Sequence, residues 1–203
     1  MEKRDFNKNW ICRCLTREEP EKKVTLPHDA MRSEQRSEES QGEGNIGWYI
    51  GGDYEYTKRF FVPAEDVDKK AVLEFEGVYH DAEIYINEKK AAFRPYGYTN
   101  FYVELNEFLQ YGAENTIRVI ARNADQPNSR WYSGTGIYRP VNLYLGTHSG
   151  KWNPHSDGQS GAGADSGGGE NINSRDCESS DSGWRTDRGC DRKNIGKENS
   201  FQK

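Results

Sequence analysis

The segment AVLEFEGVYHDAEIYI, residues 71–86, decides the fold class. Apolar residues take every second position on both sides of Gly77: Ala71, Leu73 and Phe75, then Ala82, Ile84 and Ile86. A period of two residues points alternate side chains to opposite faces of a β-strand, so one face turns inward. The segment therefore predicts two adjacent strands with a turn signal at Gly77.

The same alternation recurs along the middle of the chain. It predicts further strands at residues 56–62, 101–105, 117–121 and 141–145. Turn signals separate them at Asn87-Glu88, at Gly112 and at residues 125–128. A single short helical turn is expected at residues 106–111, with Asn106 as its cap. This spacing predicts an all-β fold, an antiparallel sandwich or jelly roll.

Composition narrows the classes of partner. The chain has 203 residues and a net charge of -5, with 33% hydrophobic and 12% aromatic residues. An acidic balance argues against nucleic acid or an anionic membrane as the main partner. The first residues are charged and no apolar run follows them, so neither a leader nor a membrane span is recognised and a cytoplasmic location is expected.

The cysteines lack the spacing of a zinc site. Cys12 and Cys14 lie near the start, and Cys177 and Cys190 lie near the end, without CxxC pairs. Reduced thiols are expected. No metal cluster, phosphate-binding loop or nucleophile motif is visible, so no cofactor is expected.

The alternation stops after Leu145, which divides the chain into a domain of residues 1–146 and a tail of residues 147–203. From the Val, Ile, Leu, Met and Phe set, the tail contains only Ile172, Ile195 and Phe201. Such a segment buries too little apolar surface to offset the entropy of ordering it. The tail is therefore expected to be disordered. The abrupt change suggests an out-of-frame translation, and a genuine disordered tail is the alternative.

The run NSRWYSGTGIYRPV, residues 128–141, is the best functional clue. Aromatic faces, amides and guanidinium groups are what a protein uses to hold a sugar. Gly134 and Gly136 allow tight turns that bring such groups together. A second aromatic cluster, Tyr96, Tyr98 and Phe101, is interpreted as sheet packing, with a sugar platform as the alternative.

Six motifs in fixed order resemble the N-terminal sugar-binding domain of glycoside hydrolase family 2, which includes β-galactosidases and β-glucuronidases. They are LPHD at 26–29, the strand at 56–61, FEGV at 75–78, IYIN at 84–87, GYTNF at 97–101 and WYSGTGIYR at 131–139. The resemblance covers residues 5–146 and implies a jelly roll. The run ahead of Gly136 resembles β-galactosidases more than glucuronidases or mannosidases. Ala30, Glu88 and Pro95-Tyr96 depart from the family pattern.

The resemblance implies a part of an enzyme. The family places an immunoglobulin-like domain and a catalytic barrel after this domain, and both catalytic carboxylates belong to the barrel. The expected partners are therefore a carbohydrate, a β-galactoside, and the barrel. Asn128, Arg130 and Trp131 are the predicted substrate-binding residues: Asn128 for hydroxyl groups, Arg130 for a hydroxyl or a barrel carboxylate, and Trp131 for stacking on a galactose ring.

Other roles for these residues remain open. The loop aromatics could instead be core or interface residues, which is the favoured interpretation for Tyr138, while Arg139 is expected to pair with an acid. At the level of the whole domain, the alternatives are a free-standing carbohydrate-binding module and a structural role in assembly.

No catalytic residue is predicted within the chain. Retaining hydrolysis needs two carboxyl groups about 5 to 5.5 Å apart. The dipeptides Asn87-Glu88 and Asn106-Glu107 are interpreted as turns. His28-Asp29 is interpreted as a structural hydrogen-bonding element at the edge of the domain. The chain alone is therefore expected to be inactive.

Overall fold

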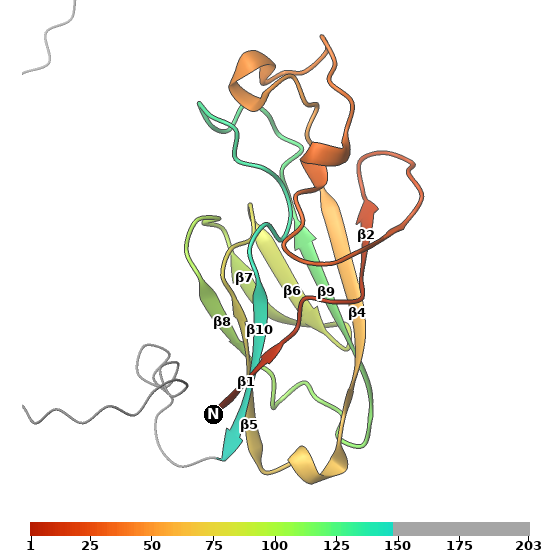
Figure 1. Ribbon diagram of the computed structural model, residues 1–203, viewed down its shortest axis with the longest axis vertical. Helices are drawn as coiled ribbons and strands as arrows, with labels where there is room; N and C mark the ends of the chain where they lie inside the picture. The colour runs from red at the N-terminus through yellow and green to blue at the C-terminus, as the bar shows by residue number, and fades with distance from the viewer. Residues whose placement is uncertain (148–203) are drawn as a thin grey trace, which may run out of the picture. The chain divides into compact units, whose positions relative to one another are not determined.

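The computed structural model describes residues 1–147, which form two antiparallel sheets (Figure 1). One sheet has the order β1 (Glu2–Asp5), β10 (Val141–Thr147), β5 (Lys69–Phe75) and β8 (Phe101–Glu104). The other has the order β3 (Lys22–Val24), β2 (Trp10–Cys14), β4 (Tyr54–Val62), β9 (Ala113–Ala121), β6 (Ala82–Ile86) and β7 (Lys89–Arg94). The helical residues described are the short 3-10 turns η1 (Ala30–Ser33), η2 (Glu43–Ile46) and η3 (Ala64–Asp66). The predicted antiparallel all-β fold is confirmed.

All the predicted strands are present, but the first two are not neighbours. β5 pairs with β10 and β8, whereas β6 pairs with β9 and β7 in the opposite sheet. The segment between them crosses from one sheet to the other instead of closing a hairpin. Alternation in the sequence shows which face of a strand is buried but not which strand pairs with it. The prediction that these two strands are adjacent was therefore wrong.

The turns follow the predicted chemistry with one exception. Asn87 and Glu88 both have positive φ, 48° and 63°, as the tight hairpin between β6 and β7 requires. Residues 106–108 form a turn and no helix. Asn106 does not cap it: its side chain accepts from the Ala71 amide at 2.9 Å and donates to the Lys69 carbonyl at 2.7 Å. Both Asn-Glu dipeptides thus belong to turns, as predicted.

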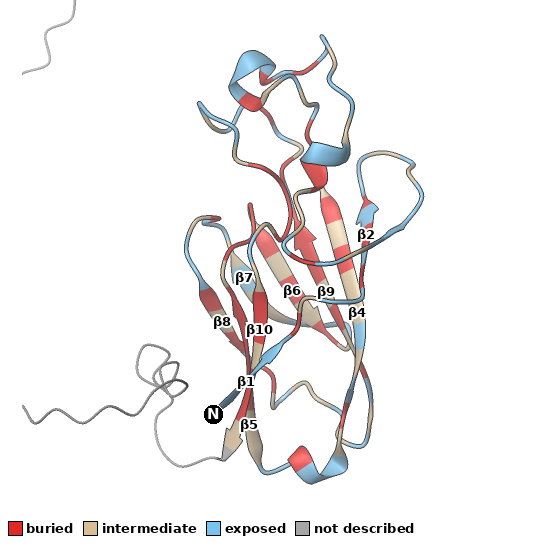
Figure 2. Ribbon diagram, viewed as in Figure 1, coloured by how far each residue is buried: buried red, intermediate tan, exposed pale blue. Residues whose placement is uncertain are grey.

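The core lies between the two sheets, and Figure 2 shows buried residues alternating with more exposed ones along several strands. Cys12 and Cys14 sit on the inner side of β2 as free thiols. Burial raises the pKa of Cys12 to about 11, so this thiol stays protonated and unreactive. The largest fully buried side chains include Trp10, Tyr56, Leu73, Phe75, Ile84, Ile86, Ile117 and Ile137.

Strand β5 is also buried on its outer side, which alternation alone did not predict. The Glu74 carboxylate is covered by two tyrosines, accepting from the hydroxyl groups of Tyr102 at 2.9 Å and Tyr144 at 2.8 Å. Burial raises the pKa of Glu74, but the hydrogen bonds from Tyr144, Tyr102 and the neighbouring amides outweigh it and leave that pKa below its ordinary value.

Long segments extend beyond one end of the strands, at the top of Figure 1. Residues 28–53 and 122–136 meet there, and we call them the loop end. Within residues 1–147 no helix is long and apolar enough to cross a membrane. β10 ends at Thr147, and the rest of the predicted tail lies outside the described residues.

Candidate functional site

Asp29 joins the two segments of the loop end. One carboxylate oxygen accepts from the amides of Met31 at 3.2 Å and Thr135 at 3.0 Å, and the other accepts from the Tyr132 hydroxyl at 2.6 Å. Thr135 is 106 residues away in sequence. Asp29 is thus committed to holding the loops, in agreement with the structural interpretation of His28-Asp29.

The neighbouring histidine is directed into the sandwich. His28 Nδ1 lies 2.9 Å from the Tyr56 hydroxyl, and burial lowers the pKa of the ring. Gly134 and Gly136, with φ of 72° and 102°, allow residues 122–136 to approach Asp29 and Tyr56 closely. A Cβ at Gly136 would collide with the Tyr56 ring and its hydroxyl, and one at Gly134 would lie 2.9 Å from Asp29 Oδ2. Both glycines are therefore backbone devices.

Asn128, the first predicted sugar ligand, is exposed at the start of the loop and held by its neighbours. Its Nδ2 lies 2.5 Å from Asn123 Oδ1, 3.0 Å from the Asp125 carbonyl and 3.2 Å from His80 Nε2, while its Oδ1 accepts from Tyr79 at 3.3 Å. An amide NH₂ has two hydrogens, so Nδ2 is fully used. Asn128 can therefore accept one further hydrogen bond, through the second lone pair of Oδ1.

Trp131 is a surface residue rather than a core aromatic. It is 59% exposed. Its indole N–H donates to the Tyr98 hydroxyl at 2.9 Å, and the Tyr98 ring packs against Tyr79 and Tyr96 at 5.2 and 5.6 Å between centroids. This contact orients the indole and leaves much of it open, which is the arrangement needed for stacking on a sugar ring.

The second aromatic cluster divides in two. Phe101 stacks on Phe75 in the core at 5.0 Å between centroids, as the packing interpretation predicted. Tyr96 is 55% exposed and lies with Tyr98 at the surface near Trp131. Of the three residues, only Phe101 is therefore sheet packing.

The two residues that end the loop play structural parts. The Tyr138 hydroxyl donates to the Gly97 carbonyl at 2.8 Å, as expected for a packing residue. Arg139 lies over the Tyr138 ring at 5.3 Å, and the predicted acid partner is not found among residues 1–147. Arg130 is exposed and makes no hydrogen bond or ion pair with the part of the chain described.

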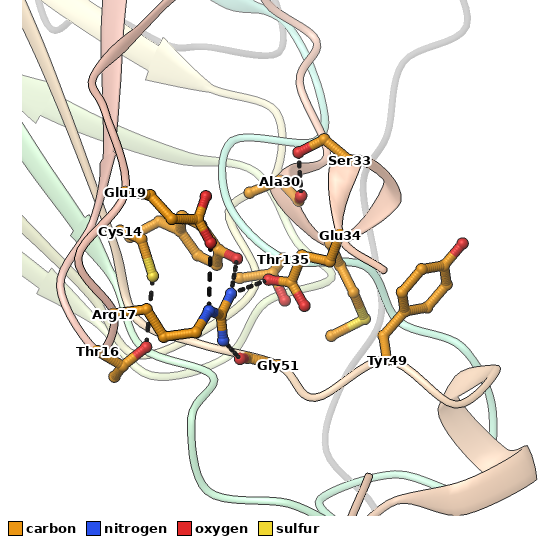
Figure 3. Close-up of polar contacts among 12 residues, drawn as sticks. Cys14, Thr16, Arg17, Glu19, Ala30, Ser33, Glu34, Tyr49, Gly51 and Thr135 are labelled. Atoms are coloured by element: carbon orange, nitrogen blue, oxygen red, sulfur yellow. Dashed lines mark hydrogen bonds and ion pairs between the residues drawn. The ribbon is translucent and has the colours of Figure 1, made fainter. Parts of the chain in front are cut away.

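A partly buried ion pair between Arg17 and Glu34 fixes the other segment of the loop end (Figure 3). Arg17 donates to Glu34 and to the Gly51 carbonyl, both at 2.5 Å, and to Glu19 at 3.2 Å. The Glu34 side chain is 8% exposed, and its Oε2 has no hydrogen-bond partner in the described residues. Burial raises the pKa of Glu34, and the Arg17 charge only partly opposes the rise.

Several residues of this site were missed in the sequence. Tyr79, His80 and Asn123 hold Asn128 and were not singled out. Tyr98, which holds Trp131, was noted only as a member of the second aromatic cluster. These residues come from three separate segments: Tyr79 and His80 directly follow the FEGV motif, Tyr98 lies within GYTNF, and Asn123 lies in no motif. Within residues 1–147 no group of three or more His, Cys, Asp and Glu side chains is placed to hold a metal ion.

Residues 30–152 match the family described as glycosyl hydrolase 2 galactose-binding domain-like. The chain belongs to this family. The predicted resemblance to the N-terminal domain of glycoside hydrolase family 2 is confirmed.

Relatives and solved structures agree with this membership. The domain is 43% identical over 119 residues to β-galactosidase BoGH2A of Bacteroides ovatus, covering 58% of this chain and 14% of that protein. It is 28% identical over 151 residues to a β-glucuronidase of Bacteroides fragilis, covering 69% and 20%. The chain thus spans a fifth or less of the length of these relatives.

Two crystal structures carry the same fold. A glycosyl hydrolase family 2 member from Bacteroides cellulosilyticus has a TM-score of 0.67 at 26% identity, covering 72% of this chain and 21% of the other. A β-glycosidase from Bacteroides vulgatus has a TM-score of 0.65 at 30% identity, covering 71% and 20%. The glycosyl hydrolase 2 domain is in each case a small part of a longer protein.

Proposed function

We propose that this domain is the non-catalytic, sugar-facing part of a retaining glycoside hydrolase of the β-galactosidase type. The exposed Trp131, oriented by Tyr98 beside Asn128, is the observation that carries the proposal. In the intact enzyme the loop end would complete the pocket for the terminal sugar and brace the catalytic barrel. The carboxylates that perform hydrolysis would come from the barrel.

The loop supplies distinct contacts in this role. Trp131 would stack on the apolar face of the galactose ring. Asn128 would accept a hydrogen bond from a sugar hydroxyl through the lone pair of Oδ1 that Tyr79 leaves free. Arg130 would donate to a hydroxyl group or to a carboxylate of the barrel, since its guanidinium has no acid partner in the described residues.

Preference for a galactoside is supported by the degree of similarity. Identity is 43% to the β-galactosidase from Bacteroides ovatus, against 28% to the β-glucuronidase from Bacteroides fragilis and 32% to a β-glucuronidase and a putative β-glucuronidase from Formosa agariphila. β-Galactosidases and β-glucuronidases both occur among the relatives, so turnover of a β-galactoside and of a β-glucuronide by the complemented enzyme would test the preference directly.

Complementation tests the proposal. The chain would be mixed with BoGH2A lacking the segment that this domain matches, and turnover of p-nitrophenyl β-D-galactoside would be followed. We expect no turnover with either component alone, co-elution of the two, and turnover in the mixture. Turnover by the chain alone would contradict a non-catalytic role. Sugar binding by the chain without co-elution or complementation would favour a free-standing carbohydrate-binding module.

A further inference from the structure

A second recognition surface lies beside the loop of Trp131. A cleft of about 560 Å³ opens between residues 32–49 and residues 130–132. Its lining includes Arg32, Arg36, Asn45, Tyr49, Arg130 and Trp131. This volume is within the range of small-ligand sites, roughly 300 to 1,000 Å³.

The charge of the cleft is uncompensated. The lining contains three arginines and no acidic residue. None of these arginines forms an ion pair in residues 1–147, whereas Arg13, Arg17, Arg118 and Arg122 each pair with a carboxylate. On a chain of net charge -5, three unpaired guanidinium groups in one cleft form a local anion-attracting site.

The nearby acids are committed elsewhere or face another hollow. Asp29 accepts from the Tyr132 hydroxyl and from two amides, and Glu34 is bound by Arg17. Glu38 and Glu43 line an adjacent hollow together with Trp48 and Arg36, which borders both hollows, but neither carboxylate forms an ion pair with Arg36. The cleft therefore keeps its positive charge.

The walls of the cleft are held in place by contacts across the loop end. Tyr49 and Tyr132 lie 5.9 Å apart between ring centroids, and Tyr132 is tied to Asp29. Arg36 pairs with Tyr49 through the backbone, and its guanidinium lies 5.6 Å from the centre of that ring. The aromatic wall and at least one guanidinium are thus positioned before a ligand arrives.

We propose that this cleft binds a saccharide unit that carries a carboxylate or sulfate group. Planar guanidinium groups bind such oxyanions through paired hydrogen bonds, and the aromatic wall suits a sugar ring. The choice of a saccharide rests on the proposed function, because the cleft shares Arg130 and Trp131 with the proposed sugar-binding loop. An acidic side chain of the barrel is the competing occupant, and one carboxylate would fill only a small part of the cleft.

Paired ligands test the proposal on the 203-residue chain. Methyl β-D-glucuronide would be compared with methyl β-D-glucoside, and methyl β-D-galactoside 6-sulfate with methyl β-D-galactoside, by calorimetry and by the shift of the Trp131 indole N–H. We expect at least one anionic ligand to bind about tenfold more tightly than its neutral counterpart, with the advantage falling as salt is raised. The two pairs distinguish a carboxylate from a sulfate.

Variants locate the effect. The double variant Arg36→Gln with Arg130→Gln should lose the preference for the anionic ligand. Arg139→Gln is the matched control, because Arg139 is also exposed and without an ion pair in the described chain but does not line the cleft. It should retain the preference.

Three outcomes would overturn the proposal. Equal affinity within both pairs would remove the anion preference while leaving the proposed function intact if Trp131→Ala still weakens galactoside binding. No binding of any of these sugars at roughly 10 mM would overturn it together with the sugar contact proposed for Trp131, and complementation would then test only the bracing of the barrel. Loss of the anion preference on adding the truncated BoGH2A would assign the cleft to the barrel.

Discussion

The core between the sheets and the loop end are stabilised by different interactions. The core is held by apolar side chains that alternate along strands, such as Leu73 and Ile84. The loop end is held by a few polar groups, Asp29, Asn128 and Arg17, that connect segments far apart in the sequence. The difference shows that folding and the proposed recognition depend on separate residues and can be altered separately.

The largest effect is expected in the core. Ile84 is fully buried in β6, so Ile84→Ala should lower the free energy of unfolding by about 2 to 5 kcal/mol through lost burial and the cavity it leaves. Urea denaturation measures this change. Phe93→Ala on the neighbouring strand is the control, because Phe93 is 53% exposed and should cost far less. Equal losses would break the distinction between a packed core and its surface.

A smaller effect is expected at the centre of the loop end. Asp29→Ala leaves two amides and the Tyr132 hydroxyl without their acceptor, which should cost about 1 to 3 kcal/mol. Hydrogen exchange should accelerate in residues 128–136 and stay unchanged in β5 and β6. Asp68→Ala, at an exposed carboxylate, serves as the control. Faster exchange throughout the sandwich would show that the two regions are not independent.

The dependence of stability on pH should have opposite signs in the two regions. The pKa of Glu34 is raised in the folded loop end, so the stability it contributes is present at low pH and is lost as pH rises through that pKa. The pKa of Glu74 is lowered in the sheet, so its contribution is present at neutral pH and is lost as pH falls through that pKa.

Urea midpoints of Glu34→Gln and Glu74→Gln, followed between about pH 3 and pH 7, check these signs. Relative to the unmodified chain, the urea midpoint of Glu34→Gln should rise as pH rises. The midpoint of Glu74→Gln should fall over the same range. A change of the urea midpoint in the same direction in both variants would contradict the opposite pKa shifts assigned to Glu34 and Glu74.

The smallest effect on stability is expected from Trp131. Because the indole is 59% exposed, Trp131→Ala should change the free energy of unfolding by less than about 0.5 kcal/mol. A loss comparable to that of Ile84→Ala would show that Trp131 belongs to the core and would remove its availability to a ligand.

Much of the sandwich could be predicted because alternation is a local signal. The strands of the middle of the chain were found within a few residues of their ends. β1, β3 and β7 were missed: β1 is four exposed polar residues, β3 has three residues, and β7 reads KKAAFR without alternation. β2 was missed although Trp10, Cys12 and Cys14 do alternate with exposed residues, and that signal could have been used.

The site could be predicted only in part because its contacts are not local. Residues 128–131 lie in one loop and were recognised by their chemistry. Their supports come from elsewhere: Tyr79 and His80 follow β5, and Asp29 reaches Thr135 across 106 residues. Loops have no periodicity that reveals such pairs, so the three-arginine cleft was not visible in the sequence.

Binding of methyl β-D-galactoside to the 203-residue chain tests the central claim most directly. The indole N–H signals would be followed in the unmodified chain, in Trp131→Ala and in Trp48→Ala, a control that removes another exposed tryptophan of the loop end. We predict saturable shifts with a dissociation constant in the range of about 1 to 10 mM, lost in Trp131→Ala and kept in Trp48→Ala. Absence of binding in the unmodified chain, or unchanged binding in Trp131→Ala, would contradict the account.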